Sequence, residues 1–148
     1  MSLVITEISE LLQHGDIADV RFLSFSGEVL SEPHEDMEDD DVRQTTQVLA
    51  GRNSDAIEVR MTITIDVREA RYEATAGTQF RHDDDLDIAE DVVIEFAERI
   101  GVMTVYPFLR EIISDMSGRL RQPNLTIPLL RAGQLNLAAE TSPDDSNE

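Results

Sequence analysis

The sequence predicts an α+β protein in which helices cover one face of an antiparallel sheet. Apolar and polar residues alternate strictly from 57 to 67, a pattern typical of a strand with one covered face. The alternation resumes from 72 to 80, and the break at 68–71 predicts a hairpin. Apolar residues then recur at helical spacing between 88 and 120, which predicts helices that pack on this sheet.

Three weaker elements precede the hairpin. A short amphipathic helix is expected at 5–14, then an extended segment at 17–30 with apolar residues on both faces, and a strand at 42–49 that ends in a turn at 51–55. The two apolar faces of 17–30 predict a strand covered on both sides. Residues 31–41 contain seven acids, whose repulsion predicts an exposed loop.

The helical region is expected to contain two helices. The first covers about 88–100 and ends at Gly101, and residues 102–105 form a short apolar connector. Pro107 then occupies the first turn of a second helix that runs to Leu120. The second helix has more apolar surface than one interface needs, which indicates burial between layers or between subunits.

The chain is expected to form one domain over 1–137. A length of 148 residues fits a single domain, and at this size roughly 70% of the surface of the unfolded chain can be buried. Residues 125–137 carry a further apolar set. Residues 138–148 are small, polar and acidic, so a disordered tail is expected there.

The charge is strongly negative, with 31 acids against 12 bases and a formal net charge of -19. Such a surface repels nucleic acid and anionic lipid, so neither is expected as a partner. Two interpretations of the charge stay open. It is either a solvated surface, for example in a salt-adapted or GC-rich host, or an acidic face that recognises one basic partner.

The chain has no cysteine, which excludes disulfides and thiol catalysis and fits a reducing cytoplasm. Its first residues have neither a basic region nor a long apolar run, so no signal peptide is predicted. No window approaches the roughly 20 apolar residues of a membrane span. A cytoplasmic protein is therefore expected.

Residue patterns for catalysis or metal binding are weak. The three histidines, at 14, 34 and 82, have no metal-ligand spacing, and the aspartate runs at 39–41 and 83–85 lack the alternating ligands of a calcium loop. No phosphate-binding glycine loop or nucleophile elbow is present. The sequence therefore predicts no enzyme, no cofactor and no metal, and a binding function is favoured.

One long segment has a more specific pattern. It begins with Tyr106-Pro107-Phe108, continues as the predicted helix through Ser114 and Gly118, and is followed by Pro123-Asn124-Leu125. Together with the strand Arg60-Met61-Thr62-Ile63-Thr64-Ile65, this order resembles the SecB family of export chaperones over about residues 57 to 130.

The resemblance implies a fold, an assembly and a function. The fold is a four-stranded antiparallel sheet with helices on one face, and two dimers pack their helices into a homotetramer. The function is that of an ATP-independent holdase, which keeps non-native polypeptides soluble. Clients of such proteins are preproteins for export or, in toxin–antitoxin branches, an aggregation-prone antitoxin.

The resemblance also implies site residues. The client-binding groove would contain residues of the connector, the second helix and the segment after it: Val102, Met103, Val105, Tyr106, Phe108, Leu125, Ile127, Leu129 and Leu130. The oligomer interface would contain Leu109, Ile112, Ile113 and Met116.

Two departures from the family pattern concern the partner. Members that deliver clients to the Sec motor ATPase carry acids and a leucine on the outer face of the sheet, where the alignment here places Phe22, Ser26, Glu73 and Thr75. The glycine-rich aromatic connector after the last strand is replaced by residues 81–85. The resemblance therefore implies client holding more strongly than delivery to the motor. The alternative hypothesis is an acidic mimic that binds one basic folded partner.

Overall fold

The computed structural model describes residues 3–83, 86–123, 125 and 127. The main sheet contains β2 (Gly15–Ile17), β3 (Arg21–Val29), β4 (Arg43–Arg52), β5 (Ala56–Val67) and β6 (Ala70–His82). Its order is β2-β6-β5-β4, and β3 also pairs with β6, so β2 and β3 follow one another along the same edge. All of these pairings are antiparallel, which confirms the predicted sheet.

The β5–β6 hairpin forms as the alternation predicts. Val67 pairs with Ala70 across a two-residue turn. One face of the hairpin is the core, and its fully buried side chains include Ile57, Val59, Ile63, Ile65 and Ala74. The other face is polar, and there Thr62 and Thr75 share a hydrogen bond of 2.7 Å.

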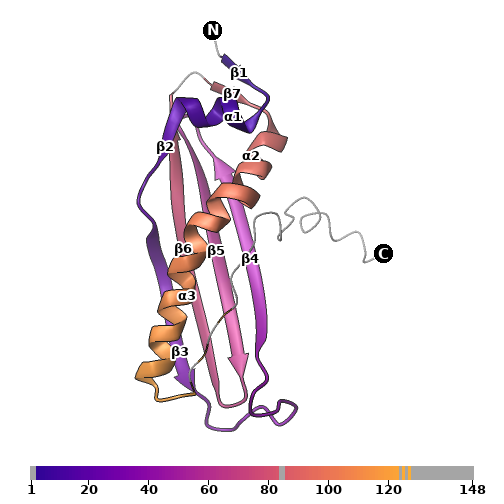
Figure 1. Cartoon of the computed structure of the whole chain (residues 1–148), viewed down its shortest axis with the longest axis vertical. Coiled ribbons are helices and arrows are strands. Elements are labelled where there is room, and N and C mark those ends of the chain that lie inside the picture. Colours follow the sequence, from indigo (N-terminus) through magenta and orange to yellow (C-terminus); the bar gives the residue numbers. More distant parts are fainter. Residues whose placement is uncertain (1–2, 84–85, 124, 126, 128–148) are drawn as a thin grey trace, which may run out of the picture.

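The helical region differs from the expectation, because it is one continuous helix. α2 (Glu90–Phe96) passes through a π-helical turn at Ala97–Gly101 into α3 (Val102–Arg119), and this long helix crosses one face of the sheet (Figure 1). The expected end at Gly101 and the connector at 102–105 are therefore wrong. Gly101 keeps right-handed helical angles, and a Cβ there would lie 2.6 Å from a methyl group of Val59, so this glycine allows close helix–sheet packing.

A small cluster closes one end of the sheet. β1 (Leu3–Ile5) pairs in parallel with β7 (Leu86–Ile88), and α1 (Ile8–Leu11) continues into a 3₁₀ turn at Leu12–His14. The helix expected at 5–14 is therefore shorter than predicted, because residues 3–5 pair as a strand and Gly15 begins β2. The strand expected at 42–49 also differs, since β4 includes Gly51 and Arg52 and the turn covers only 53–55.

Strand β3 is less covered than expected. Leu23, Phe25 and Val29 are 43%, 52% and 50% exposed, so the prediction of a strand covered on both faces is wrong. β3 pairs only with β6 among the described residues and packs mainly against α3 from the helical layer, so it lies at an edge. The acidic segment 31–41 contains turns but no helix or strand, and its side chains are mostly exposed.

Pro107 lies inside α3, and its expected position in a first helical turn is wrong. A proline there lacks the N–H that would bond to the carbonyl four residues earlier, at a typical cost of about 3 kcal/mol. Because proline also restricts the unfolded chain, Pro107→Ala is expected to raise the free energy of unfolding by about 1–2 kcal/mol. Urea denaturation followed by circular dichroism measures this change, and a decrease would contradict the helical account of this position.

Candidate functional site

Exposed aromatic side chains gather where β3 meets α3. Phe22 packs edge-to-face against Phe25 with ring centroids 5.8 Å apart, and against Phe108 of α3 at 6.4 Å. Phe25 and Phe108 are 52% and 41% exposed, and Phe22 and Ile112 are half-buried. We call these four residues the apolar strip. A cluster of exposed apolar side chains on a folded domain is typical of a surface that binds another polypeptide or a ligand.

A β-bulge creates the strip. Phe22 and Phe25 are three residues apart, so a regular strand would place them on opposite faces. The register shifts between Phe22 and Ser24, so that Phe22 pairs with Ala76 and Phe25 with Ala74, and both of these alanines belong to the core face. Both phenylalanines therefore lie on the helix side, and the expected placement of Phe22 on the outer face is wrong.

The surroundings of the strip suit an extended polypeptide. A depression of about 540 Å³ is lined by Phe22, Ile112 and neighbouring polar residues of α3, including Glu111 and Asp115. Along β3, no described residue pairs with the edge that faces away from β6. A free strand edge offers backbone donors and acceptors to an added strand, while apolar positions beside it accept its side chains.

The predicted client-binding residues fall into three groups. Phe108 belongs to the apolar strip and Met103 is half-buried. The others within the described part of the chain are buried inside the protomer: Val102, Val105, Tyr106, Leu125 and Ile127. Leu129 and Leu130 lie outside the described residues. The structure thus brings Phe108 together with Phe22 and Phe25, neither of which the sequence analysis assigned to client binding. Client binding by the whole predicted set stays a prediction.

The residues predicted for an oligomer interface mostly belong to the core of one protomer. Leu109 and Ile113 are fully buried and Met116 is 8% exposed, whereas Ile112 is half-buried and lies in the apolar strip. The dimer of dimers stays a prediction.

The segment after α3 returns along the helix. Leu125 and Ile127 are both buried, and the Arg110 Nε donates a 2.9 Å hydrogen bond to the carbonyl oxygen of Ile127. Among the described residues, no three acidic or histidine side chains come together in a way that could hold a metal ion. Within 3–83 and 86–123, no helix is long and apolar enough to cross a membrane.

Comparison with known proteins agrees with this architecture. No family model matches the chain. The SecB-like chaperone SmegB of Mycolicibacterium smegmatis is 33% identical over 131 residues, which cover 88% of this chain and 86% of that protein. The chain belongs to the SecB-like chaperones.

The fold of this SecB-like chaperone also matches a solved structure. The SecB-like chaperone Rv1957 of Mycobacterium tuberculosis, in complex with a ChAD peptide from the antitoxin HigA1, superposes with a TM-score of 0.67 at 22% identity. The match covers 82% of this chain and 91% of that one. The predicted family and fold class are thereby confirmed.

Proposed function

We propose that this SecB-like chaperone is an ATP-independent holdase that binds extended, non-native polypeptides along the apolar strip and the free edge of β3. The exposed pair Phe25 and Phe108, packed around Phe22, is the observation that carries the proposal. Holding a chain in this way needs only burial of apolar surface, so the proposed activity involves no catalysis and no cofactor.

The energetics of the strip fit reversible holding. A phenylalanine buries up to roughly 150–250 Å², and about half of Phe25 is still exposed in this structure. At about 25 cal/mol per Å², completing the burial of one such ring contributes about 2 kcal/mol. Several contacts of this size along one client, repeated on several protomers, give useful affinity for the client without a single tight contact.

We propose an antitoxin as the specific client, bound in the cytoplasm. The support is that the neighbouring structure of Rv1957 holds a peptide from an antitoxin. The outer face of the sheet also favours this client over export. Of the four positions aligned to the motor-binding pattern of acids and a leucine, Phe22 faces the helices instead. On the outer face, Ser26 pairs with Glu73, and Thr75 pairs with Thr62 and Ser24. Glu73 is thus the one acid among the four positions.

Light scattering tests the holding function. A chemically unfolded test protein is diluted into buffer with and without this protein, in the absence of nucleotide. Suppression of aggregation near stoichiometric amounts is the expected result, because one strip holds one segment of client. Normal aggregation in the presence of the folded protein contradicts the proposal and favours a dedicated folded partner instead.

The antitoxin client has its own test. An antitoxin encoded beside the gene for this chain is expected to stay soluble when the two are co-expressed, and to aggregate when it is expressed alone. An antitoxin that is equally soluble in both cases contradicts this part of the proposal and leaves the holding function standing.

A further inference from the structure

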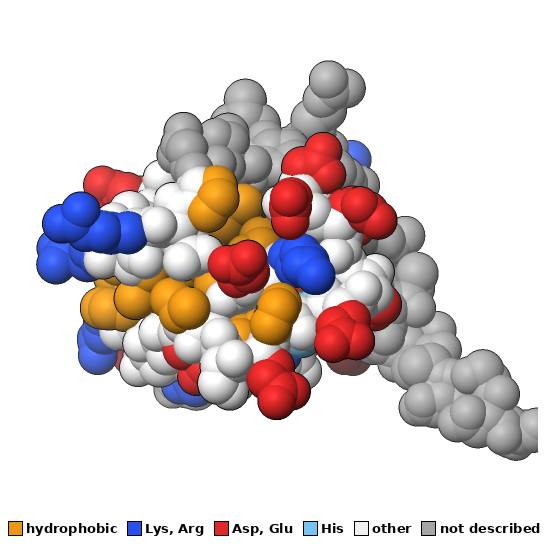
Figure 2. Space-filling model, turned by 90° about the horizontal axis from the view of Figure 1, so that it is seen from below, with side chains coloured by type: hydrophobic (Ala, Val, Ile, Leu, Met, Phe, Trp, Pro, Cys, Tyr) orange, Lys and Arg blue, Asp and Glu red, His pale blue; other side chains and the backbone are white. Residues whose placement is uncertain are grey.

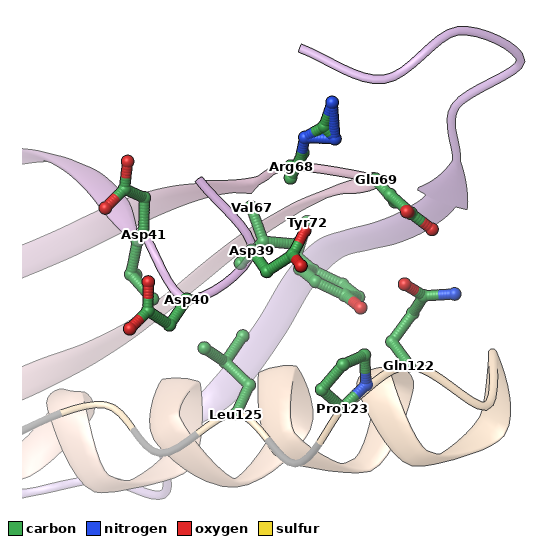
Figure 3. Close-up of a pocket in the computed structure, with 11 residues that line it drawn as sticks. Asp39, Asp40, Asp41, Val67, Arg68, Glu69, Tyr72, Gln122, Pro123 and Leu125 are labelled. Atoms are coloured by element: carbon green, nitrogen blue, oxygen red, sulfur yellow. The ribbon is translucent and has the colours of Figure 1, made fainter. Parts of the chain in front are cut away.

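Two depressions of opposite charge lie on this protein. Seen from the end of the sheet that carries the β5–β6 turn, hydrophobic side chains lie between acidic and basic ones (Figure 2). The depression at this end, of about 430 Å³, is acidic, and Figure 3 shows Asp39, Asp40 and Asp41 in its lining. The other depression, of about 670 Å³, lies near the junction of β2 and β3 and is lined by Arg21, Arg60 and Arg81. We call it the arginine hollow.

The path of the chain between β2 and β3 creates the arginine hollow. β2 ends opposite position 80 of β6, and β3 begins opposite position 77. Three residues, 18–20, therefore pass two residues of β6, and the edge of the sheet is interrupted there. The link is held by two hydrogen bonds, because the Ala18 N–H donates to the Gln79 carbonyl at 2.7 Å and the Thr78 hydroxyl donates to the Ala18 carbonyl at 2.9 Å.

Gly77 forms the floor of the arginine hollow. It pairs with Arg60 of β5 on one side and with Arg21 of β3 on the other, so two arginines flank a position without a side chain. Neighbouring strands lie about 4.8 Å apart, so the Cα atoms of these arginines are about 10 Å apart. A Cβ at position 77 would lie 3.2 Å from the Arg60 Cγ. Glycine inside a strand often marks a place where another group approaches the backbone, and here it leaves the space between the arginines open.

Two arginines of the hollow have no ionic partner. In the described part of the chain, eight of eleven arginines contact a carboxylate or a carbonyl oxygen. The other three are Arg21, Arg81 and Arg121, and the first two line the hollow. Arg81 lies opposite Asp16 in the register, yet no ion pair within 4 Å joins them. Because acids outnumber bases 31 to 12, two unpaired arginines in one depression indicate a site for a carboxylate from another molecule.

The spacing of the arginines suits an extended acidic segment. Arg81 lies four residues beyond Gly77 on the same strand and the same face, about 13 Å away. The lining acids are Asp19 and Glu58, and Glu58 already accepts a 2.9 Å hydrogen bond from Arg60, so the hollow has one net positive charge. We infer that the arginine hollow docks an extended acidic segment of a partner protein, with two carboxylates four residues apart.

The lining favours a polypeptide over a nucleic acid. It contains no aromatic side chain on which a base could stack. It does contain Leu23, which is 43% exposed, and the half-buried Val20, and both can contact an apolar side chain of a peptide. The net charge of -19 also repels a long polyanion, whereas a short acidic segment meets mainly the local arginines.

The arginine hollow is separate from the apolar strip. Phe22 of the strip pairs with Ala76 on the core face, and the adjacent pair Arg21 and Gly77 lies on the outer face. None of the four positions aligned to the motor-binding pattern lines the hollow, whose arginines also have the opposite charge to the acids of that pattern. The inference therefore goes beyond the holding function, because one protomer can bind a client and the acidic partner at the same time.

Two short peptides test the inference. Both are labelled with rhodamine and consist of threonine and serine with one leucine. One has two aspartates four residues apart, and the other has asparagine at both positions. The net charge of the protein opposes binding of the aspartate peptide, whereas charge-assisted hydrogen bonds from the arginines favour it. Fluorescence anisotropy at physiological salt is expected to show that the aspartate peptide binds about tenfold more tightly.

Two double variants locate the effect. In Arg21→Gln/Arg81→Gln, the asparagine peptide is expected to bind as tightly as the aspartate peptide or more tightly, because the acidic field then acts alone. The control, Arg99→Gln/Arg119→Gln, removes the same charge from exposed positions on the long helix and is expected to keep the tenfold preference. Circular dichroism checks that both variants are folded. A preference that survives in the first variant, or that the control abolishes, overturns the inference.

The separate location has its own measurement. Binding of the aspartate peptide is expected to stay the same when the protein is first loaded with an unfolded test protein, and displacement by that client overturns a separate docking site. Equal binding of the aspartate and asparagine peptides overturns the docking site and leaves the holding function intact, since light scattering tests that function independently.

Three further outcomes would assign the hollow to another occupant and overturn the partner. The first is loss of peptide binding in millimolar inorganic phosphate, which identifies a site for a small oxyanion. The second is a tenfold gain in affinity when the four acids of residues 138–148 are replaced by their amides, which identifies the end of this chain. The third is slower sedimentation of Arg21→Gln/Arg81→Gln than of the unaltered protein, which identifies an acidic segment of a second copy.

Discussion

Replacing Phe25 with threonine and Phe108 with glutamine is expected to weaken client holding at least tenfold while the protein stays folded. Both rings are about half exposed, so each loses little packing within the protomer. For a client, each ring offers about 100 Å² of apolar surface, worth about 2 kcal/mol. Threonine suits a strand and glutamine a helix, so the local structure is expected to persist.

The measurement is the amount of protein that halves the aggregation of an unfolded test protein. Leu49→Thr/Leu12→Gln is the matched control, because it makes the same kinds of change at a strand position and a helical position that are 59% and 43% exposed. Circular dichroism checks that all variants are folded. Equal loss in the control would show that general surface hydrophobicity holds the client, and would contradict a role for the apolar strip.

Tyr106 shows why exposure has to be known before such a variant is chosen. The family resemblance groups it with Phe108 as a client contact, but Tyr106 is only 4% exposed. Tyr106→Asp would put a carboxylate in the core and unfold the protein, so its loss of activity would say nothing about clients.

The hairpin could be predicted from the sequence because its information is local. Strict alternation over 57–67 fixes which side chains face the core, and a one-residue slip would turn all of them to solvent. The family resemblance supplied what this pattern does not contain, namely the helices on one face and a function in binding unfolded chains. The relatives confirm the family.

The apolar strip could not be predicted, because local alternation of apolar and polar residues, which predicts the hairpin correctly, gives the wrong face at a bulge. Alternation assigns Phe22 and Phe25 to opposite faces, and the bulge between Phe22 and Ser24 reverses that assignment for one of them. A bulge is decided by the pairing with β6, which lies about fifty residues away in the chain. The one available signal was the presence of apolar residues on both faces of 17–30, and it favoured a covered strand equally well.

The meaning of a glycine inside a helical pattern is ambiguous in a similar way. Substitution of Gly101 is expected to have the second large effect, which is on stability. The same residue can end a helix or allow a close approach, and here the neighbour of the helix decides. A Cβ at position 101 would lie between 2.6 and 2.9 Å from three side-chain atoms of Val59, which is fully buried and stiff. Alanine favours a helix by about 1 kcal/mol over glycine, but overpacking of up to about 3 kcal/mol outweighs this gain.

Gly101→Ala is therefore expected to lower the free energy of unfolding by about 2 kcal/mol in urea denaturation. Gly118→Ala is the control in the same helix, because a Cβ there meets nothing within 4 Å, and it is expected to stabilise the protein by up to about 1 kcal/mol.

A double-mutant cycle then identifies the cause of the destabilisation by Gly101→Ala. Val59→Ala removes the two methyl groups nearest the new Cβ, so the double variant is expected to be more stable than the sum of the single changes by more than about 1 kcal/mol. If the stability changes of Gly101→Ala and Val59→Ala simply add, the alanine at position 101 does not clash with Val59. The glycine would then not be explained by close packing of the helix on β5.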